Sequence, residues 1–159
     1  MESSVFDLTT IDLGGRKERV LRGGRHLFPR LVRAFDGIER IGVIGWGPQG
    51  RAQAMNLRDS LAGTPVTVTV GLRAGSASLD AARAEGFSEA DGTLGEMFDV
   101  IRRSDLVILL IADAGLAELH KAVFAALRPG AVVGLSHGFL LAHLRSEVEV
   151  LVRRARFLY

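Results

Sequence analysis

Short apolar runs alternate with amphipathic helical patterns from residue 41 onward, and no other feature of the sequence restricts the possible folds as strongly. The apolar runs read RIGVIG, VTVTVGLR, DLVILLIAD and AVVGL. Continuous apolar runs are typical of strands that helices cover on both sides, and strands that alternate with helices favour a parallel sheet. The sequence therefore predicts an α/β fold of the Rossmann type, a doubly wound and mostly parallel sheet with helices on both faces. Such sheets bind ligands beyond the carboxyl ends of their strands.

Capping residues predict where two of the helices begin. Ser78 is expected to be the N-cap of a helix over SLDAARAEG, and Thr93 with Glu96 has the spacing of a capping box at the start of TLGEMFDVIRRS. The pattern LAELHKAVFAAL predicts a further helix, with His120 on its exposed surface. Before these elements, residues 1–39 are polar and irregular apart from a helical candidate at HLFPRLVRAF.

The stretch IGVIGWGPQG, residues 41–50, places Gly45, Gly47 and Gly50 in the spacing G-x-G-x-x-G. These glycines follow a predicted strand and open a predicted helix, which is the context that a dinucleotide-binding motif requires. The first glycine is expected to permit the tight turn, the second the close approach of a pyrophosphate, and the third the packing of helix on strand. The start of the helix offers free amides and a partial positive charge to phosphate groups. The alternative is a plain turn that binds no ligand.

The end of the second predicted strand indicates which dinucleotide is bound. NAD-binding sites usually have an acidic residue there to hold the ribose 2′-hydroxyl. The stretch VTVGLRAGSAS has no acid and instead carries Arg73, followed by Ser76 and Ser78. A guanidinium and two hydroxyls suit a 2′-phosphate, so the sequence favours NADP(H) over NAD. An exposed arginine followed by a helix-capping serine is the alternative.

Composition excludes several classes of protein. With no cysteine, the chain has no disulfide and no thiolate metal site. Its formal net charge is +2, its arginines are scattered and its aromatic content is 6%, which argues against nucleic-acid binding. No apolar run reaches the roughly 18 residues that span a bilayer, and the start MESSVFDLTT has no signal-peptide pattern. A cytoplasmic protein without membrane contact is expected.

Four stretches in order carry a resemblance to a known family: IGVIGWGPQGRAQAMNLRDSL, GLRAGSASLDAARAEGF, DLVILLIADA and LSHGFLL. Together they resemble the N-terminal, NADP-binding domain of ketol-acid reductoisomerase, also called acetohydroxy-acid isomeroreductase, in its plant-like long form. The resemblance covers about residues 20–144. It implies a Mg²⁺-dependent alkyl migration in 2-acetolactate or 2-aceto-2-hydroxybutyrate, followed by reduction with NADPH to a 2,3-dihydroxy acid. These reactions lead to valine, isoleucine and leucine.

The resemblance also implies roles for individual residues. The pyrophosphate loop would be formed by Trp46, Gly47, Pro48, Gln49 and Gly50. The 2′-phosphate contacts would come from Arg73, Ser76 and Ser78. Asp113 would lie in a loop beside the cofactor, and His137, in SHGF, would be the active-site histidine. The position of His137 after a buried strand also suits a residue that donates to or orients a polar ligand group, with a purely structural histidine as the alternative.

The chain also departs from the family pattern. Pro48 has no amide hydrogen, so one pyrophosphate contact is expected to be lost if that amide normally faces the cofactor. No acidic residues have a convincing metal-site arrangement, so no metal ligand is predicted. The helical second domain, which supplies the Mg²⁺ carboxylates in the family, is not recognisable in the sequence. Cofactor binding without turnover by this chain alone is therefore expected.

These features predict three parts: an N-terminal extension at residues 1–39, an NADP-binding Rossmann domain at 40–144 and a divergent tail at 145–159. The tail is predicted to continue an amphipathic helix, with the short edge strand VEVLV as the alternative. Such an organisation leaves open self-association or pairing with a separate second domain. Two other functions also stay open, a non-catalytic dinucleotide-binding or interaction module and a different Rossmann reductase.

Overall fold

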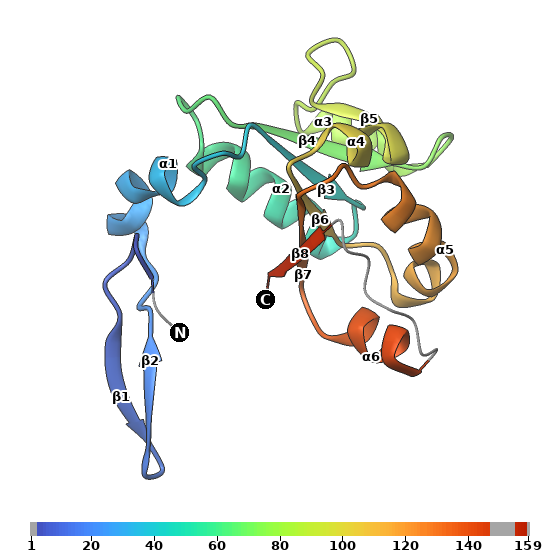
Figure 1. Cartoon of the computed structure of the whole chain (residues 1–159). Helices are drawn as coiled ribbons and strands as arrows, with labels where there is room; N and C mark the ends of the chain where they lie inside the picture. The colour runs from blue at the N-terminus through green and yellow to red at the C-terminus, as the bar shows by residue number, and fades with distance from the viewer. Residues whose placement is uncertain (1–2, 147–154, 159) are drawn as a thin grey trace. The chain divides into compact units, whose positions relative to one another are not determined.

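The computed structural model describes residues 3–146 and 155–158 and divides into two compact units, Met1–Gly37 and Ile38–Tyr159 (Figure 1). The first unit holds an antiparallel hairpin of β1 (Thr9–Leu13) and β2 (Arg16–Val20), a 3₁₀ helix η1 (Arg25–Arg30) and the short helix α1 (Leu31–Ala34).

The hairpin corrects the expectation that this region is irregular, whereas the helical candidate is confirmed by η1 and α1. Gly14 and Gly15 form the two-residue turn of the hairpin, with φ values of 61° and 84°. A Gly-Gly turn with positive φ at both positions matches the twist of a hairpin, so the sequence did carry this signal.

The second unit is built on a six-stranded sheet in the order β5-β4-β3-β6-β7-β8, with every adjacent pair parallel. The strands are β3 (Arg40–Ile44), β4 (Thr67–Leu72), β5 (Leu94–Glu96), β6 (Leu106–Leu109), β7 (Ala131–Leu135) and β8 (Ala155–Leu158). Counted from β3, this is the order 3-2-1-4-5-6 that is typical of dinucleotide-binding sheets. The predicted Rossmann-type α/β fold is confirmed.

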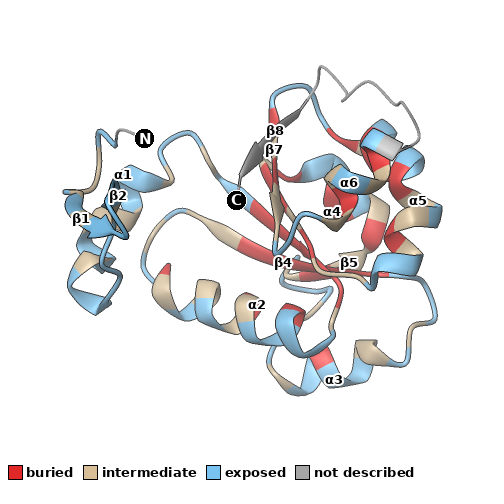
Figure 2. Cartoon of the chain, turned by 90° about the horizontal axis from the view of Figure 1, so that it is seen from below, coloured by how far each residue is buried: buried red, intermediate tan, exposed pale blue. Residues whose placement is uncertain are grey.

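Helices cover both faces of this sheet. They are α2 (Pro48–Ser60), α3 (Ser78–Ala84), α4 (Met97–Arg103), α5 (Asp113–Ala126) and α6 (Phe139–Ser146). The first two lie on one side, and α4, α5 and α6 form a contiguous layer on the other (Figures 1 and 2). The most buried residues follow the central strands between the two layers, as Figure 2 shows.

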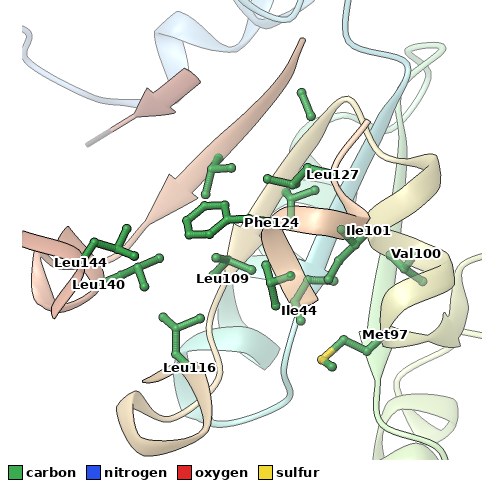
Figure 3. Close-up of a cluster of buried hydrophobic side chains, with 14 residues drawn as sticks. Ile44, Met97, Val100, Ile101, Leu109, Leu116, Phe124, Leu127, Leu140 and Leu144 are labelled. Atoms are coloured by element: carbon green, nitrogen blue, oxygen red, sulfur yellow. The ribbon is translucent and has the colours of Figure 1, made fainter. Parts of the chain in front are cut away.

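The largest part of the core lies between the sheet and the layer of α4, α5 and α6 (Figure 3). Ile44 of β3 and Val107 of β6 meet Ile101 of α4 and Val123 of α5 there, each 2% exposed or less. Burying aliphatic side chains of this size contributes roughly 1.5–3 kcal/mol each relative to exposure. This packing fixes the strand ends from which the ligand-facing loops start.

Two of the predicted helix starts are wrong. Ser78 is the first helical residue of α3, and its N-cap is Ala77, which has no side-chain acceptor. The predicted capping box at Thr93 and Glu96 is replaced by strand β5, because Leu94 and Gly95 pair with β4. Glu96 instead caps α4 itself, since its Oε2 accepts from the amides of Phe98 at 2.8 Å and Asp99 at 3.2 Å. The sequence therefore predicts correctly that Glu96 takes part in capping this helix, but the helix begins after Glu96 and not after Thr93.

The predicted C-terminal tail contributes a strand to the sheet. Strand β8 pairs in parallel with β7, from Ala131 with Ala155 to Gly134 with Leu158. The apolar stripe that starts at Leu140 is helical as far as the end of α6. The rest of the predicted helix and the alternative strand VEVLV lie at residues 147–152, outside the described residues.

Asp105 ties three elements together at the amino ends of the strands. Its Oδ2 accepts from the amides of Glu39 and Arg40, both at 2.9 Å, and its Oδ1 pairs with the guanidinium of Arg128. The side chain is only 13% exposed. One carboxylate therefore joins the start of β3 to the starts of β6 and β7.

Asp105→Ala is expected to lower the free energy of unfolding by about 1–2 kcal/mol, because two hydrogen bonds from backbone amides and an ion pair are lost. Asp105→Asn should recover part of this, since the amide oxygen still accepts. Denaturant unfolding of the three proteins measures the difference. Equal stability of the alanine variant and the parent would contradict the role of Asp105.

Candidate cofactor site

The glycine motif forms the sharp turn between β3 and α2. Gly45 has φ of +112°, and a Cβ there would lie 2.6 Å from the carbonyl oxygen of Leu110. A Cβ on Gly50 would overlap the carbonyl oxygen of Gly45 and lie 2.8 Å from its carbon. Gly47 has no atom within 4 Å of the position of a Cβ. Two of the glycines are therefore required by the protein itself, and Gly47 leaves open space.

Helix α2 begins at this turn with Gly47 as N-cap and Pro48 at the first position. Proline suits that position because the amide there has no partner within the helix. The amides of Gln49 and Gly50, which follow it, also have no intrahelical acceptor. The start of α2 thus offers two donors to a phosphate group.

A cavity of about 390 Å³ opens where β3, β6 and β7 end. It is lined by Gly47, Pro48, Gln49, Leu110, Ile111, Ala112, Asp113, Ser136 and His137. β3 and β6 are neighbours in the sheet, and the strand order reverses between them. This reversal is the position at which doubly wound sheets bind their ligands, so five of the predicted site residues line the expected crevice.

Arg73, Ser76 and Ser78 lie outside that cavity, the first two in the turn between β4 and α3 and Ser78 at the first position of α3. The amide of Ser76 donates to the carbonyl of Arg73 at 3.0 Å, and Gly75 permits the turn with φ of +71°. The amide of Ser78 donates to the Ser76 hydroxyl at 3.3 Å. Arg73 is exposed. Because β4 adjoins β3 in register, this turn lies at the same edge of the sheet as the glycine loop.

The segment that follows α3 is held against α2 and the glycine loop by contacts of Glu85 and Phe87. The Trp46 ring meets the buried Phe87 ring edge-on at 5.4 Å, and the Arg58 guanidinium lies 4.9 Å from the centre of the Phe87 ring. Arg58 also donates to the Glu85 carbonyl at 2.6 Å, and Arg51 pairs with the Glu85 carboxylate. The glycine loop, through Trp46, is thereby packed on the segment that follows α3.

The far end of α3 carries an exposed ion pair. Arg83 donates to the carboxylate of Glu89 at 2.6 Å and to that of Asp80 at 2.6 Å. The hydrogen bond from Arg83 lowers the pKa of Glu89 below its ordinary value, and the bond to Glu89 raises the pKa of Arg83. Since both groups are exposed, this pair adds little to stability.

His137 and Asp113 meet at the wall of the cavity. Asp113 is the first residue of α5, which corrects the expectation that it lies in a loop. Its Oδ1 lies 3.4 Å from His137 Nε2, and the amide of Phe139 donates to His137 Nδ1 at 3.4 Å. Both side chains are about half exposed.

Ser136 is the polar residue among the four lining residues that the sequence analysis did not predict; the others are Leu110, Ile111 and Ala112. It directly follows β7 and lines the same cavity as His137. Its signal was its place at the carboxyl end of a strand, where ligand-binding residues gather.

His120, expected on a helix surface, is instead 3% exposed. Its Nδ1 lies 2.7 Å from the Ala117 carbonyl oxygen, and its ring meets that of His143 edge-on at 5.2 Å. Its place between α5 and α6 is structural. Within residues 3–146 and 155–158 there is no group of three or more histidine or acidic residues that could hold a metal ion. The described part of the chain also contains no helix with the length and apolar character needed to cross a membrane.

Comparison with known proteins identifies the family of the chain. The sequence model described as "Acetohydroxy acid isomeroreductase, NADPH-binding domain" matches residues 38–152. The chloroplastic ketol-acid reductoisomerase of Spinacia oleracea is 54% identical over 147 residues, which cover 91% of this chain and 25% of that protein. The ketol-acid reductoisomerase (NADP(+)) of Helicobacter pylori strain Shi470 is 43% identical over 105 residues, or 63% of this chain and 28% of that protein.

A solved structure shows the same fold. It is an NADH-preferring ketol-acid reductoisomerase from an uncultured archean, with a TM-score of 0.62 and 22% identity, and the match covers 80% of this chain and 35% of that one. The chain thus spans about a quarter of the length of the curated relatives it matches. On the family match and the identity to the spinach protein, the chain belongs to the acetohydroxy acid isomeroreductase family and corresponds to its NADPH-binding domain.

Proposed function

We propose that this chain binds NADPH as the cofactor domain of a ketol-acid reductoisomerase that converts 2-acetolactate or 2-aceto-2-hydroxybutyrate to 2,3-dihydroxy acids. The observation that carries the proposal is the crevice at the β3–β6 reversal, where the glycine loop and Asp113 line one cavity with His137. The family match to the NADPH-binding domain supports the choice of cofactor.

Each group has a part in this proposal. The amides of Gln49 and Gly50 bind the pyrophosphate, and Gly47 leaves room for its approach. Arg73 binds the 2′-phosphate with the hydroxyls of Ser76 and Ser78. His137 donates a hydrogen bond to a ligand oxygen at the strand end. Bound NADPH would supply the hydride for the reductive step.

The described residues do not fit the Mg²⁺ site that the family reaction needs, because they contain no suitable cluster of ligands. The alkyl migration is therefore proposed for the whole protein, and cofactor binding is proposed for this chain. Mixing the chain with a separately made second domain and following acetolactate consumption tests whether the two can act together. If the chain binds the cofactor but the mixture consumes no acetolactate, the result favours the alternative, a non-catalytic dinucleotide-binding module.

A titration with NADPH and NADH tests the central proposal. Trp46 is the only tryptophan of the chain and lies in the glycine loop, so we expect its emission to change when a dinucleotide binds there. We expect saturable quenching by NADPH at lower concentrations than by NADH. Absence of quenching together with absence of binding by calorimetry would overturn the proposal.

The cytoplasmic location and self-association stay predictions. The spinach relative is named as chloroplastic, so cell fractionation has an organelle as its alternative outcome. Light scattering after size exclusion measures the oligomeric state with and without NADPH.

A further inference from the structure

The two nitrogens of the His137 ring have different partners. The amide of Phe139 donates to Nδ1, and the carboxylate of Asp113 faces Nε2, each at 3.4 Å. A nitrogen that accepts from an amide carries no proton, and a nitrogen that faces a carboxylate is the one that donates. Each partner therefore favours the same tautomer, with the proton on Nε2.

Both partners belong to the first residue of a helix. Phe139 is the first residue of α6, and the amide of Ala142 donates to the Gly138 carbonyl at 3.1 Å, so the Phe139 amide is free of intrahelical bonds. Asp113 is the first residue of α5, which packs beside α6. The ring thus bridges the starts of two neighbouring helices.

In the two described cavities that His137 lines, Asp113 is the other ionisable side chain. The large cavity in front of His137 has Asp113 as its other ionisable side chain. A smaller cavity of about 20 Å³ is lined by Asp113, Ser136 and His137 together with apolar side chains. The choice of tautomer therefore depends on Asp113 and on the Phe139 amide.

We propose that Asp113 is a positioning residue which, with the Phe139 amide, holds His137 as a single tautomer with the proton on Nε2, so that His137 meets a ligand as a hydrogen-bond donor. Such a donor selects an oxygen acceptor, as in a carbonyl, hydroxyl or carboxylate group. An entering oxygen replaces the Asp113 carboxylate as the acceptor of the hydrogen bond from Nε2–H, and the tautomer does not change. The use of this donor on a substrate rests on the proposed function, but the tautomer itself is a property of the free protein.

The test is ¹⁵N NMR of the histidine rings in the ligand-free chain, at a pH where the rings are neutral, with His137 assigned from the His137→Gln spectrum. The parent is expected to show one proton-bearing and one bare nitrogen in His137. In Asp113→Ala the two nitrogen shifts should move toward averaged values as the ring exchanges between tautomers. Asp99→Ala, which removes a first-turn aspartate from α4, is the matched control and should leave His137 unchanged.

The second arm removes the other partner. Phe139→Pro deletes the amide hydrogen at the first position of a helix, where proline is tolerated, and Phe139→Ala keeps that hydrogen while removing the ring. We expect averaging of the His137 nitrogens in the proline variant only. Averaged shifts in the parent, or parent-like shifts in both Asp113→Ala and Phe139→Pro while thermal melting shows them folded, would overturn the inference.

Added NADPH separates this inference from the proposed function. If the tautomer is fixed in the free protein but neither Trp46 quenching nor calorimetry shows NADPH binding, the positioning role stands and the cofactor proposal fails. If NADPH binds but the two nitrogen shifts of His137 in the free protein are already averaged, the cofactor proposal stands and the positioning role of Asp113 fails.

Discussion

Alanine at Gly45 or Gly50 should destabilise the protein whether or not cofactor is present, whereas alanine at Gly47 should leave its stability unchanged and weaken NADPH binding. A methyl group on Gly50 overlaps the backbone of Gly45, and one on Gly45 lies 2.6 Å from the Leu110 carbonyl oxygen. Overpacking costs about 1–3 kcal/mol. Alanine at Gly45 also introduces backbone strain of about 1–3 kcal/mol, since φ of +112° is unfavourable for alanine. Each is a large share of a total stability of roughly 5–15 kcal/mol.

Gly47→Ala is the informative contrast because a Cβ there meets nothing in the protein and its φ of −67° suits any residue. Only a ligand in the crevice would meet the new methyl group. We expect a free energy of unfolding within about 0.5 kcal/mol of that of the parent. NADPH affinity should fall about tenfold or more, and a tenfold loss corresponds to about 1.4 kcal/mol of binding free energy. Unfolding in urea and the Trp46 titration measure the two effects separately.

The opposite pattern would contradict the assignment of the glycines. If Gly47→Ala binds NADPH as the parent does, the pyrophosphate does not approach at this residue. If Gly50→Ala is as stable as the parent, the close packing of α2 on the end of β3 is not required.

The parts of the fold that were predictable from the sequence are those determined by local patterns. Apolar runs with helical segments between them gave the parallel sheet, because each buried strand needs cover on both faces. The glycine spacing located the turn between β3 and α2, because backbone atoms close to Gly45 and Gly50 leave no room for a Cβ at either residue. The short strand β5 was missed because Leu94 and Gly95 are strand residues only through their pairing with β4.

The candidate site was predictable by position but not by contact. The places of Asp113 and His137 after successive strands followed from the carboxyl-end rule, but their pairing at 3.4 Å depends on how α5 and α6 begin side by side. His120 shows the same limit. Its place on α5 was correct, but its burial against α6 depends on packing between helices that periodicity alone does not give.

Arg73→Ala should reduce NADPH affinity about tenfold to a hundredfold and leave NADH affinity within about twofold of the parent. Hydrogen bonds to a charged group contribute roughly 1.5–3 kcal/mol, and NADH has no 2′-phosphate to lose. Arg73 is exposed, and its carbonyl rather than its guanidinium holds the turn to Ser76, so the substitution should not unfold the site. Paired titrations with both cofactors measure the ratio.

Arg102→Ala is the matched control, because it removes one exposed arginine at the end of α4, next to the amino end of β6 and away from the ligand edge. It should leave both affinities unchanged, which separates a local contact from the effect of net charge. Arg73→Asp extends the argument, since a carboxylate repels a 2′-phosphate but accepts from a ribose 2′-hydroxyl. That variant should therefore prefer NADH, and a retained preference for NADPH in it would show that the 2′-phosphate is bound elsewhere than at the β4–α3 turn.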